Sequence, residues 1–386
     1  MSKPKVCHMT SVHTSRDGRI FHKQCVSLAK AGYETYLVAP GDSFTEKGVK
    51  VIGVGARPSS RIKRIFFFAK QVYKTARALD ADIYHFHDPE LLPYGLKLKK
   101  QGKKVIFDAH EHYEQTIAAS PWIIPPLRKL AAKYYIDKER KAIKKFDAVV
   151  CVTPTQYEPY KAAGANVYMI TNYPILNEAP STPYARNRKI CFAGGIKPEW
   201  MHENIINCLI ECDAEYVLAG PCNPSYLQKL QSLDGWKNVD YRGQIPFEEV
   251  PKLMRECSVG MAVLNYSWNT QGRIGTLGVN KVFEYMYAGL PVVCTDFELW
   301  KGVIEDSLRL EQIHIKSCGI CVNPNNVQAF SDAICHLLNS PNEAEQMGSN
   351  GRKVVEGEYN WGIQERKLVE MYQRIAQKYN SKGVTV

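Results

Sequence analysis

The sequence lacks any uninterrupted apolar run near the ~20 residues that a membrane-spanning helix needs. It also lacks the apolar core of a signal peptide, because the opening Met-Ser-Lys-Pro-Lys is followed by only a few apolar residues. Short-period repeats and low-complexity tracts are absent as well. These absences argue against a repeat architecture and predict a soluble or peripheral protein without a spanning helix or a cleaved leader.

Signatures of nucleic-acid-binding proteins, such as a helix-turn-helix, an RRM or a zinc motif, are also missing. The net charge of +11 therefore favours an anionic membrane or an anionic substrate over a nucleic acid as partner. Lysines that only keep the surface soluble would explain the same charge. We expect no nucleic-acid partner.

The twelve cysteines do not suggest a disulfide framework. Most lie in apolar, strand-like runs, as Cys7, Cys151, Cys191 and Cys294 do, where a free cysteine is usually a small core residue. This usage favours a reducing compartment. We therefore expect a cytoplasmic protein.

The 386 residues, 45% hydrophobic and 23% charged, are enough for two globular domains. Short β-branched runs alternate with amphipathic stretches in the first half, and the pattern restarts after a linker at 172–187 that is rich in Pro, Asn, Ser and Thr. This alternation predicts two doubly wound parallel sheets. Strands are expected at 5–9, 34–38, 49–54, 83–87, 104–108 and 148–152, and again at 187–193, 216–219, 259–263, 292–294 and 319–322.

A run from Asn280 to Met286, Asn-Lys-Val-Phe-Glu-Tyr-Met, follows a loop that contains Gly275 and Gly278. The amides at the start of a helix here would favour an anion such as a diphosphate, and Lys281 would add a positive charge. Glu284, one turn further on, is placed to accept hydrogen bonds from ribose hydroxyls. The spacing alone is equally compatible with a capped helix carrying a surface lysine and glutamate.

This run resembles the donor-site helix of glycosyltransferase family four, whose members have the GT-B fold and include bacterial polysaccharide and capsule enzymes. The resemblance extends, in the same order, to segments along the whole chain: the first strand with its loop Thr10 to Arg19, His85-Phe86-His87-Asp88-Pro89, Asp108-Ala109-His110-Glu111, Phe192-Ala193-Gly194-Gly195-Ile196, Leu218-Ala219-Gly220-Pro221 and Tyr359-Asn360-Trp361. It implies two Rossmann-like doubly wound domains facing across a cleft, at residues 1–172 and 173–362. It further implies that a last helix, within 363–386, packs back on the first domain.

The resemblance also implies roles for particular residues of the second domain. Glu284 would bind the donor ribose, at a helix that Asn280 begins. The glycine turn Gly194-Gly195 with Lys197, Arg273 and Lys281 would hold the diphosphate, although Arg273 could equally be an exposed loop arginine. Two family positions differ: Thr276 replaces a glutamate that usually contacts the donor sugar, and Trp200 or a neighbour stands where a basic residue is usual.

In the first domain, His110 and Glu111 follow a predicted strand and would face the reaction centre. By resemblance they would position the reacting groups rather than act as a nucleophile; a structural histidine is the alternative. Gly18, Arg19, His87 and Asp88 are the acceptor-binding candidates. Arg19 could also be an ordinary surface arginine.

Histidines at strand ends open another possibility, because His85, His87, His110 and His112 could ligate a divalent metal. A metal-dependent hydrolase is therefore an alternative, although no H-E-x-x-H spacing supports it. The D-x-D sequence at Asp80-Ala81-Asp82 precedes a strand and reads better as a turn. We predict transfer without a metal or another cofactor.

Two segments of the first domain, 61–68 and 121–145, mix basic residues with aromatic and aliphatic ones. Such segments bind anionic membranes, although each alone also fits a core-facing stripe.

The resulting prediction is a retaining glycosyltransferase at the inner face of the plasma membrane. It would move a sugar from a UDP- or GDP-linked donor to a lipid-linked saccharide in surface polysaccharide synthesis. A nucleotide-sugar epimerase or hydrolase of the same fold, and a non-catalytic saccharide-binding module, remain alternatives.

Overall fold

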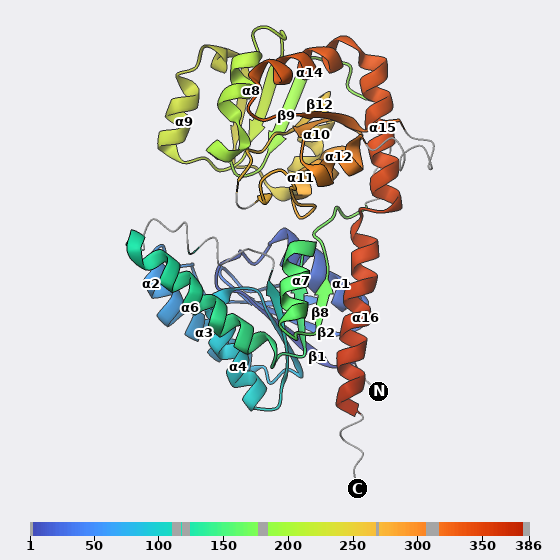
Figure 1. The fold of residues 1–386 in the computed structure, drawn as a ribbon. Helices are drawn as coiled ribbons and strands as arrows, with labels where there is room; N and C mark the ends of the chain where they lie inside the picture. The colour runs from blue at the N-terminus through green and yellow to red at the C-terminus, as the bar shows by residue number, and fades with distance from the viewer. Residues whose placement is uncertain are drawn as a thin grey trace. The chain divides into compact units, whose positions relative to one another are not determined.

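The computed structural model describes residues 3–109, 117, 124–176, 184–267, 270–305 and 316–380. The chain divides into two compact units (Figure 1). Unit 1 comprises Met1–Asn172 with Trp361–Val386, and unit 2 comprises Tyr173–Asn360. Among the described residues, no helix is both long and apolar enough to cross a membrane.

Unit 1 is built on an eight-stranded sheet with the order β3-β4-β2-β1-β5-β6-β7-β8. All neighbouring strands are parallel except β3 and β4, which are antiparallel. The inner strands are buried on both faces, as expected for a parallel sheet covered by helices. The strands are β1 (Lys5–Met9), β2 (Glu34–Ala39), β3 (Phe44–Glu46), β4 (Val49–Gly53), β5 (Ile83–Phe86), β6 (Lys104–Ala109), β7 (Ala148–Cys151) and β8 (Val167–Met169).

Helices on both faces of this sheet complete unit 1 (Figure 1). The last of them, α16, packs against η1 and α1, and its Trp361 Nε1 donates to Ser27 Oγ at 2.9 Å. The expected return of the C-terminal helix to the first domain is thus confirmed. The helices are η1 (Gly18–Cys25), α1 (Val26–Lys30), α2 (Arg61–Lys63), η2 (Arg64–Phe68), α3 (Ala69–Ala78), η3 (Pro89–Leu91), α4 (Leu92–Lys100), α6 (Pro125–Ile143), α7 (Pro154–Ala162) and α16 (Trp361–Asn380).

Unit 2 contains a six-stranded, fully parallel sheet with the order β11-β10-β9-β12-β13-β14. Together the two sheets confirm the predicted pair of doubly wound α/β domains. The strands are β9 (Lys189–Ala193), β10 (Glu215–Ala219), β11 (Val239–Gly243), β12 (Val259–Ala262), β13 (Val292–Thr295) and β14 (Gly319–Val322). The helices are η4 (Pro198–Trp200), α8 (His202–Cys208), α9 (Pro224–Gln231), η5 (Asp234–Asn238), η6 (Phe247–Glu249), α10 (Val250–Arg255), α11 (Asn280–Tyr287), α12 (Glu298–Ile304), α14 (Val327–Asn339) and α15 (Pro341–Gly357).

The cysteines depart from the expectation in one respect. Cys212 and Cys335 form a disulfide across 123 residues, a separation that leaves no local spacing signal in the sequence. Most of the other ten are buried, as expected. Cys318 and Cys321 make a C-x-x-C pair, and Cys321 Sγ lies 3.6 Å from Cys294 Sγ.

Candidate active site

Two glycines shape the carboxyl edge of the unit 2 sheet. Gly194 follows β9 with φ 146°, and Gly220 follows β10 with φ 140°. A Cβ atom on Gly194 would overlap Lys281 Nζ, and one on Gly220 would overlap the carbonyl oxygen of Gly194. The Gly194 amide donates to the Ala219 carbonyl at 2.8 Å. Only glycine fits at either position, so the turn at Gly194 carries no side chain that would keep a ligand from the backbone.

Helix α11 begins beside this turn. Its buried face consists of Val282, Phe283, Tyr285 and Met286, which pack in the unit 2 core, while Lys281 and Glu284 fall on the partly exposed face. The N-terminal Val279 provides no side-chain cap. The first amides of α11 therefore have no side-chain acceptor from their capping residue, an arrangement that favours an anion.

Lys281 directs its ammonium group at the glycine turn. Its Nζ donates to the carbonyl of Ala193 and lies over the rings of Phe192 and Trp200, 4.5 Å and 5.5 Å from their centroids. Burial lowers the pKa of Lys281 from its usual value, while Glu284 acts in the opposite direction. A positive charge is thus held at the start of α11, where an anion would bind.

Glu284 and Asn280 lie one turn apart on α11 and contact each other. Asn280 Nδ2 donates to Glu284 Oε1, which orients the carboxylate. The Oδ1 atom of Asn280 is buried and has no hydrogen-bond partner among the described residues. The pair therefore offers a held carboxylate and a free amide oxygen, both of which accept hydrogen bonds from hydroxyl groups.

The other predicted donor residues are more exposed. Lys197 is exposed beside the glycine turn, its Cε 3.7 Å from where a Cβ of Gly195 would lie. The exposed Arg273 places its guanidinium over the ring of Tyr266, 5.3 Å from the centroid. Thr276 is tied into its loop, because its hydroxyl accepts from Gly278 N at 3.0 Å and its carbonyl accepts from Trp300 Nε1 at 2.8 Å. A phosphate contact by Arg273 stays a prediction.

In unit 1, Arg19 is buried in an ion pair rather than exposed on a loop. Its Nε and Nη2 donate to the two carboxylate oxygens of Asp108, both at 3.1 Å, and its Nη1 donates to the carbonyl of Ile170 at 3.0 Å. The exposed fractions of the two side chains are 6% and 0%. Gln24 Nε2 also donates to Asp108, at 2.6 Å. Because these partners occupy its guanidinium, the surface-arginine alternative for Arg19 is wrong, and an acceptor contact stays a prediction.

Three fully buried imidazoles lie beside this ion pair, those of His8, His85 and His87. His8 Nδ1 and His87 Nε2 are 3.0 Å apart, and the hydroxyl of Tyr372 on α16 lies 2.8 Å from His85 Nδ1 and 3.2 Å from His8 Nε2. Burial, and after it the neighbouring His87, holds the pKa of His8 well below its usual value. Burial and the neighbouring His8 do the same for the pKa of His85. Both rings are therefore neutral at physiological pH.

The histidines predicted from sequence as metal ligands are not the same set as the histidines that the fold brings together. Within the described part of the chain, ring nitrogens of His8, His85 and His87 lie within 4.8 Å of one another. His110 and His112 lie outside the described residues. Three imidazoles suit a zinc ion chemically. In this structure, however, His8 bonds to both His87 and Tyr372, and Tyr372 also bonds to His85, so the cluster fastens α16 to the sheet.

The remaining acceptor candidates support the loop after β1. Asp88, fully buried, accepts from Thr10 Oγ1 at 2.9 Å and from Ser11 N at 2.5 Å. Gly18 begins η1, where the carboxylate of Asp17 accepts from the next two amides. The two predicted reaction-centre residues, His110 and Glu111, lie outside the described residues.

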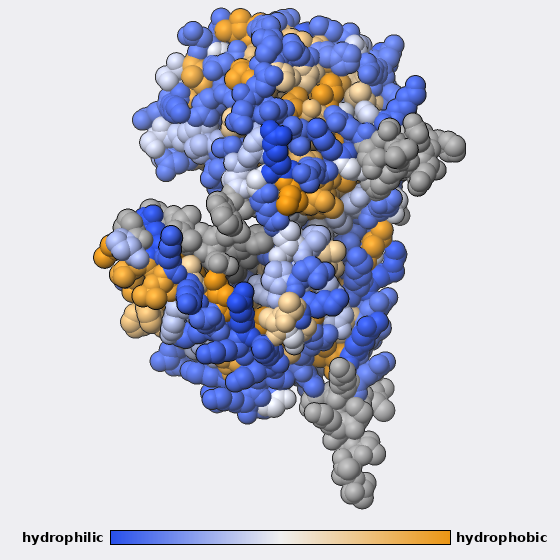
Figure 2. Space-filling model, in the orientation of Figure 1, coloured by the Kyte–Doolittle hydropathy of each residue, from blue (hydrophilic) through white to orange (hydrophobic). Residues whose placement is uncertain are grey.

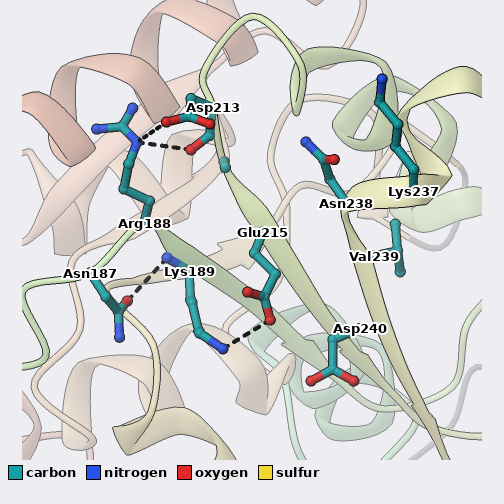
Figure 3. Close-up of a pocket in the computed structure, with 10 residues that line it drawn as sticks. Asn187, Arg188, Lys189, Asp213, Glu215, Lys237, Asn238, Val239 and Asp240 are labelled. Carbon is teal, nitrogen blue, oxygen red and sulfur yellow. Dashed lines mark hydrogen bonds and ion pairs between the residues drawn. The ribbon is translucent and has the colours of Figure 1, made fainter.

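A separate hollow of about 510 Å³ lies at the amino ends of β9, β10 and β11 (Figure 3). Four of its charged side chains form two pairs: Lys189 Nζ with Glu215 at 2.9 Å, and Arg188 Nε with Asp213 at 3.5 Å. In open α/β sheets ligands bind at the carboxyl ends of the strands. The glycine turn and α11, at the opposite edge, are therefore the better candidate.

Comparison with known proteins decides the family. Residues 18–172 match the model of Glycosyltransferase Family 4, and residues 187–340 match that of Glycosyl transferases group 1. The chain is a glycosyltransferase of the GT-B fold. No curated protein sequence is significantly similar to this transferase.

Solved structures agree on the fold. Sucrose-phosphate synthase from Thermosynechococcus elongatus is similar with a TM-score of 0.70 and 16% identity, over 97% of this chain and 99% of the synthase. Anabaena HepE in complex with UDP and glucose is similar with a TM-score of 0.67 and 13% identity, over 98% of this chain and 100% of HepE. S. aureus TarM, in complex with UDP, is similar with a TM-score of 0.58 and 15% identity, over 79% of this chain and 59% of TarM.

Proposed function

We propose that this transferase moves a sugar from a UDP- or GDP-linked donor to a lipid-linked saccharide used in cell-surface polysaccharide synthesis. The observation that carries the proposal is the position of the Lys281 ammonium, at the Gly194 turn and the start of α11. A nucleoside diphosphate has the two groups that this arrangement would bind: a charged diphosphate, and a ribose with hydroxyls for Glu284 and Asn280. The structures of HepE and TarM, both in complexes with UDP, support this donor class.

The residues then have separate tasks in the transfer. As the bond between the sugar's anomeric carbon and the diphosphate oxygen breaks, negative charge grows on the diphosphate, and Lys281 with the first amides of α11 stabilises it. The acceptor hydroxyl forms the new bond to the anomeric carbon and passes its proton to the departing diphosphate. Because the acceptor hydroxyl attacks from the face that the diphosphate leaves, this scheme retains the donor configuration, and it needs neither a protein nucleophile nor a metal. His110 and Glu111 are proposed to position the acceptor hydroxyl.

The donor assignment is tested by nucleotide-dependent thermal stability. A ligand that binds only the folded protein raises its melting temperature, so UDP or GDP is expected to stabilise the wild type. Glu284→Ala removes the ribose acceptor and is expected to weaken nucleotide binding by about tenfold, or about 1.4 kcal/mol. Differential scanning fluorimetry across UDP, GDP and their sugar conjugates measures both effects.

Glu343→Ala is the matched control, because Glu343 lies on α15 and is 49% exposed beside His336. It should leave the nucleotide shift unchanged. An unaltered shift in Glu284→Ala would show that the carboxylate does not contact the nucleotide. Product analysis with a lipid-linked acceptor separates transfer from epimerisation or hydrolysis of the donor.

We also propose that an apolar-basic face of unit 1 binds the anionic inner surface of the plasma membrane. Its large hydrophobic side chains are 51–71% exposed, which overturns the alternative of a core-facing stripe for these positions. Figure 2 shows hydrophobic residues gathered over α2 and the start of α6, and exposed Arg61, Lys63, Lys129 and Lys133 lie among them in sequence. The hydrophobic residues are Ile62, Phe66, Phe67, Ile124, Leu127, Leu130 and Tyr134. Residues 121–123 lie outside the described residues.

Vesicle co-sedimentation tests this face. The wild type should pellet with vesicles containing phosphatidylglycerol and much less with phosphatidylcholine alone, because lysines near an anionic surface contribute about 1 kcal/mol each. Replacing Phe66, Phe67 and Leu130 together by serine should release it. The matched control replaces exposed Val327 of α14 by serine. Equal pelleting with neutral vesicles, or a dimer that buries this face in solution, would contradict membrane binding.

A further inference from the structure

The ammonium of Lys281 rests on an aromatic pair, Phe192 and Trp200, which we call the aromatic seat. Phe192 is the fourth residue of β9 and is 1% exposed, whereas Trp200 ends η4 and is half-buried. Their ring centroids are 5.1 Å apart at an angle of 62°. Lys281 Nζ lies 4.5 Å from the first centroid and 5.5 Å from the second, within the range of cation–π attraction.

The seat is supported from the unit 2 core. His202, fully buried at the start of α8, packs edge-on against the Phe192 ring at 4.7 Å and 87°. Its Nδ1 lies 3.0 Å from the hydroxyl of Tyr216, and burial lowers the pKa of His202 to about 3, so the ring is neutral. Met201, with φ 53°, turns the chain between Trp200 and α8. A neutral histidine adds no positive charge that would push the Lys281 ammonium away.

The nature of this support matters for an anionic ligand. A lysine held by a carboxylate is neutralised by it, and the carboxylate also repels an incoming phosphate. Among the described residues, ring faces and one carbonyl oxygen contact the Lys281 ammonium, and the Glu284 carboxylate acts on it without forming an ion pair within 4.0 Å. The positive charge therefore stays available to a ligand. The partial charges of the rings and the carbonyl attract a cation more strongly where water is excluded, as at this partly buried position.

On the basis of the proposed function, we infer that Trp200 is a positioning residue for donor binding. It holds the Lys281 ammonium at the Gly194 turn before the nucleotide arrives, so that less side-chain freedom is lost when the diphosphate binds. The aromatic ring therefore serves the diphosphate indirectly, at a position where the sequence has no basic residue. Because Trp200 acts through Lys281, its contribution should vanish when Lys281 is replaced.

A double-mutant cycle tests this inference through UDP affinity, measured by isothermal titration calorimetry. Trp200→Leu keeps an apolar side chain but removes the ring, and it is expected to weaken UDP binding about tenfold. Trp200→Phe and Trp200→Tyr keep a ring face and should remain within about threefold of the wild type. In a Lys281→Met background, Trp200→Leu should cause no further loss, because the group that the ring holds is gone. With donor sugar, Trp200→Leu should raise KM and leave kcat nearly unchanged.

The outcomes separate this inference from the function on which it rests. Unchanged or tighter UDP binding by Trp200→Leu, together with weak binding by Lys281→Met, would overturn the aromatic seat and leave the donor site in place. Full binding by Lys281→Met would overturn the donor site itself. If Trp200→Leu is too unstable for calorimetry at ordinary temperature, the UDP affinities of Trp200→Leu and Trp200→Phe are compared at low temperature. Equal losses of UDP affinity in the two variants would contradict the inference. Rescue by Phe or Tyr alone would support it.

Discussion

Replacing Arg19 by methionine is expected to lower the free energy of unfolding by about 3–5 kcal/mol, because it removes the guanidinium that pairs with a buried carboxylate. Asp108 is fully buried and receives two of the three guanidinium hydrogen bonds, while the third reaches the carbonyl of Ile170. Gln24 Nε2 would still donate to Asp108 Oδ2 at 2.6 Å, but it carries no charge. Urea denaturation followed by circular dichroism measures the loss.

Lys50→Met is the matched control for this prediction. Lys50 pairs with Glu34 at 3.0 Å, but the two side chains are 52% and 46% exposed. An exposed pair contributes about 0–1 kcal/mol, so this variant should unfold nearly like the wild type. A loss below about 1 kcal/mol in Arg19→Met would mean that Asp108 finds water or another donor, and that the ion pair is not structural.

Lys281→Met is expected to weaken UDP binding by about 2–4 kcal/mol, or roughly 30- to 1,000-fold, because it removes the charge held at the start of α11. Binding by the wild type should also weaken at alkaline pH. Burial lowers the pKa of Lys281 below 10.5, the ammonium is charged only below that pKa, and the attraction for a diphosphate is lost as pH rises through it. Calorimetric titrations between neutral and alkaline pH measure the dependence.

The pH dependence identifies the group responsible. In Lys281→Met, UDP affinity should be low and nearly flat over the same alkaline range. Lys229→Met is the control, because Lys229 lies on α9, is 64% exposed and pairs with Glu203. Its affinity and alkaline profile should match those of the wild type. A Lys281→Met protein that keeps the wild-type alkaline profile would assign the titration to another residue.

Much of the fold followed from local pattern. The strands at Lys5–Met9 and Gly319–Val322 have the predicted bounds, because each is a short, mostly apolar run. Two edge strands, Val167–Met169 and Val239–Gly243, had no such pattern: their residues are all half-buried, and so polar and apolar ones mix.

Helix α15 was not predicted for a different reason. It contains Gly348 and Gly351, which usually indicate loops. In the fold these glycines let α15 approach α11: a Cβ on Gly348 would overlap the carbonyl of Gly289, and one on Gly351 would lie 3.1 Å from Met286 Cγ. The need for glycine arises from a partner helix more than fifty residues away, which no local window contains.

Some residues of the candidate site could likewise be placed from sequence, and others could not. Asn280, Lys281 and Glu284 could be placed from sequence because they lie on one helix, where spacing sets relative position. The buried cluster of unit 1 could not, because His8, Asp108 and Tyr372 come from separate elements. One signal was present: His8 lies directly opposite His85 in the register of β1 and β5. That register exists only once the two strands pair.

Local chemistry thus sufficed for the alternation of strands and helices, the two-sheet architecture and the anion-favouring start of α11, since each depends on residues close together in the chain. The tertiary structure alone decided that Arg19 pairs with Asp108, that Cys212 bonds to Cys335, and that the Lys281 ammonium rests on aromatic rings. These contacts join residues 80 or more positions apart. Their partners are selected by burial and by the need to satisfy charge in the core, and both arise only when the chain has folded.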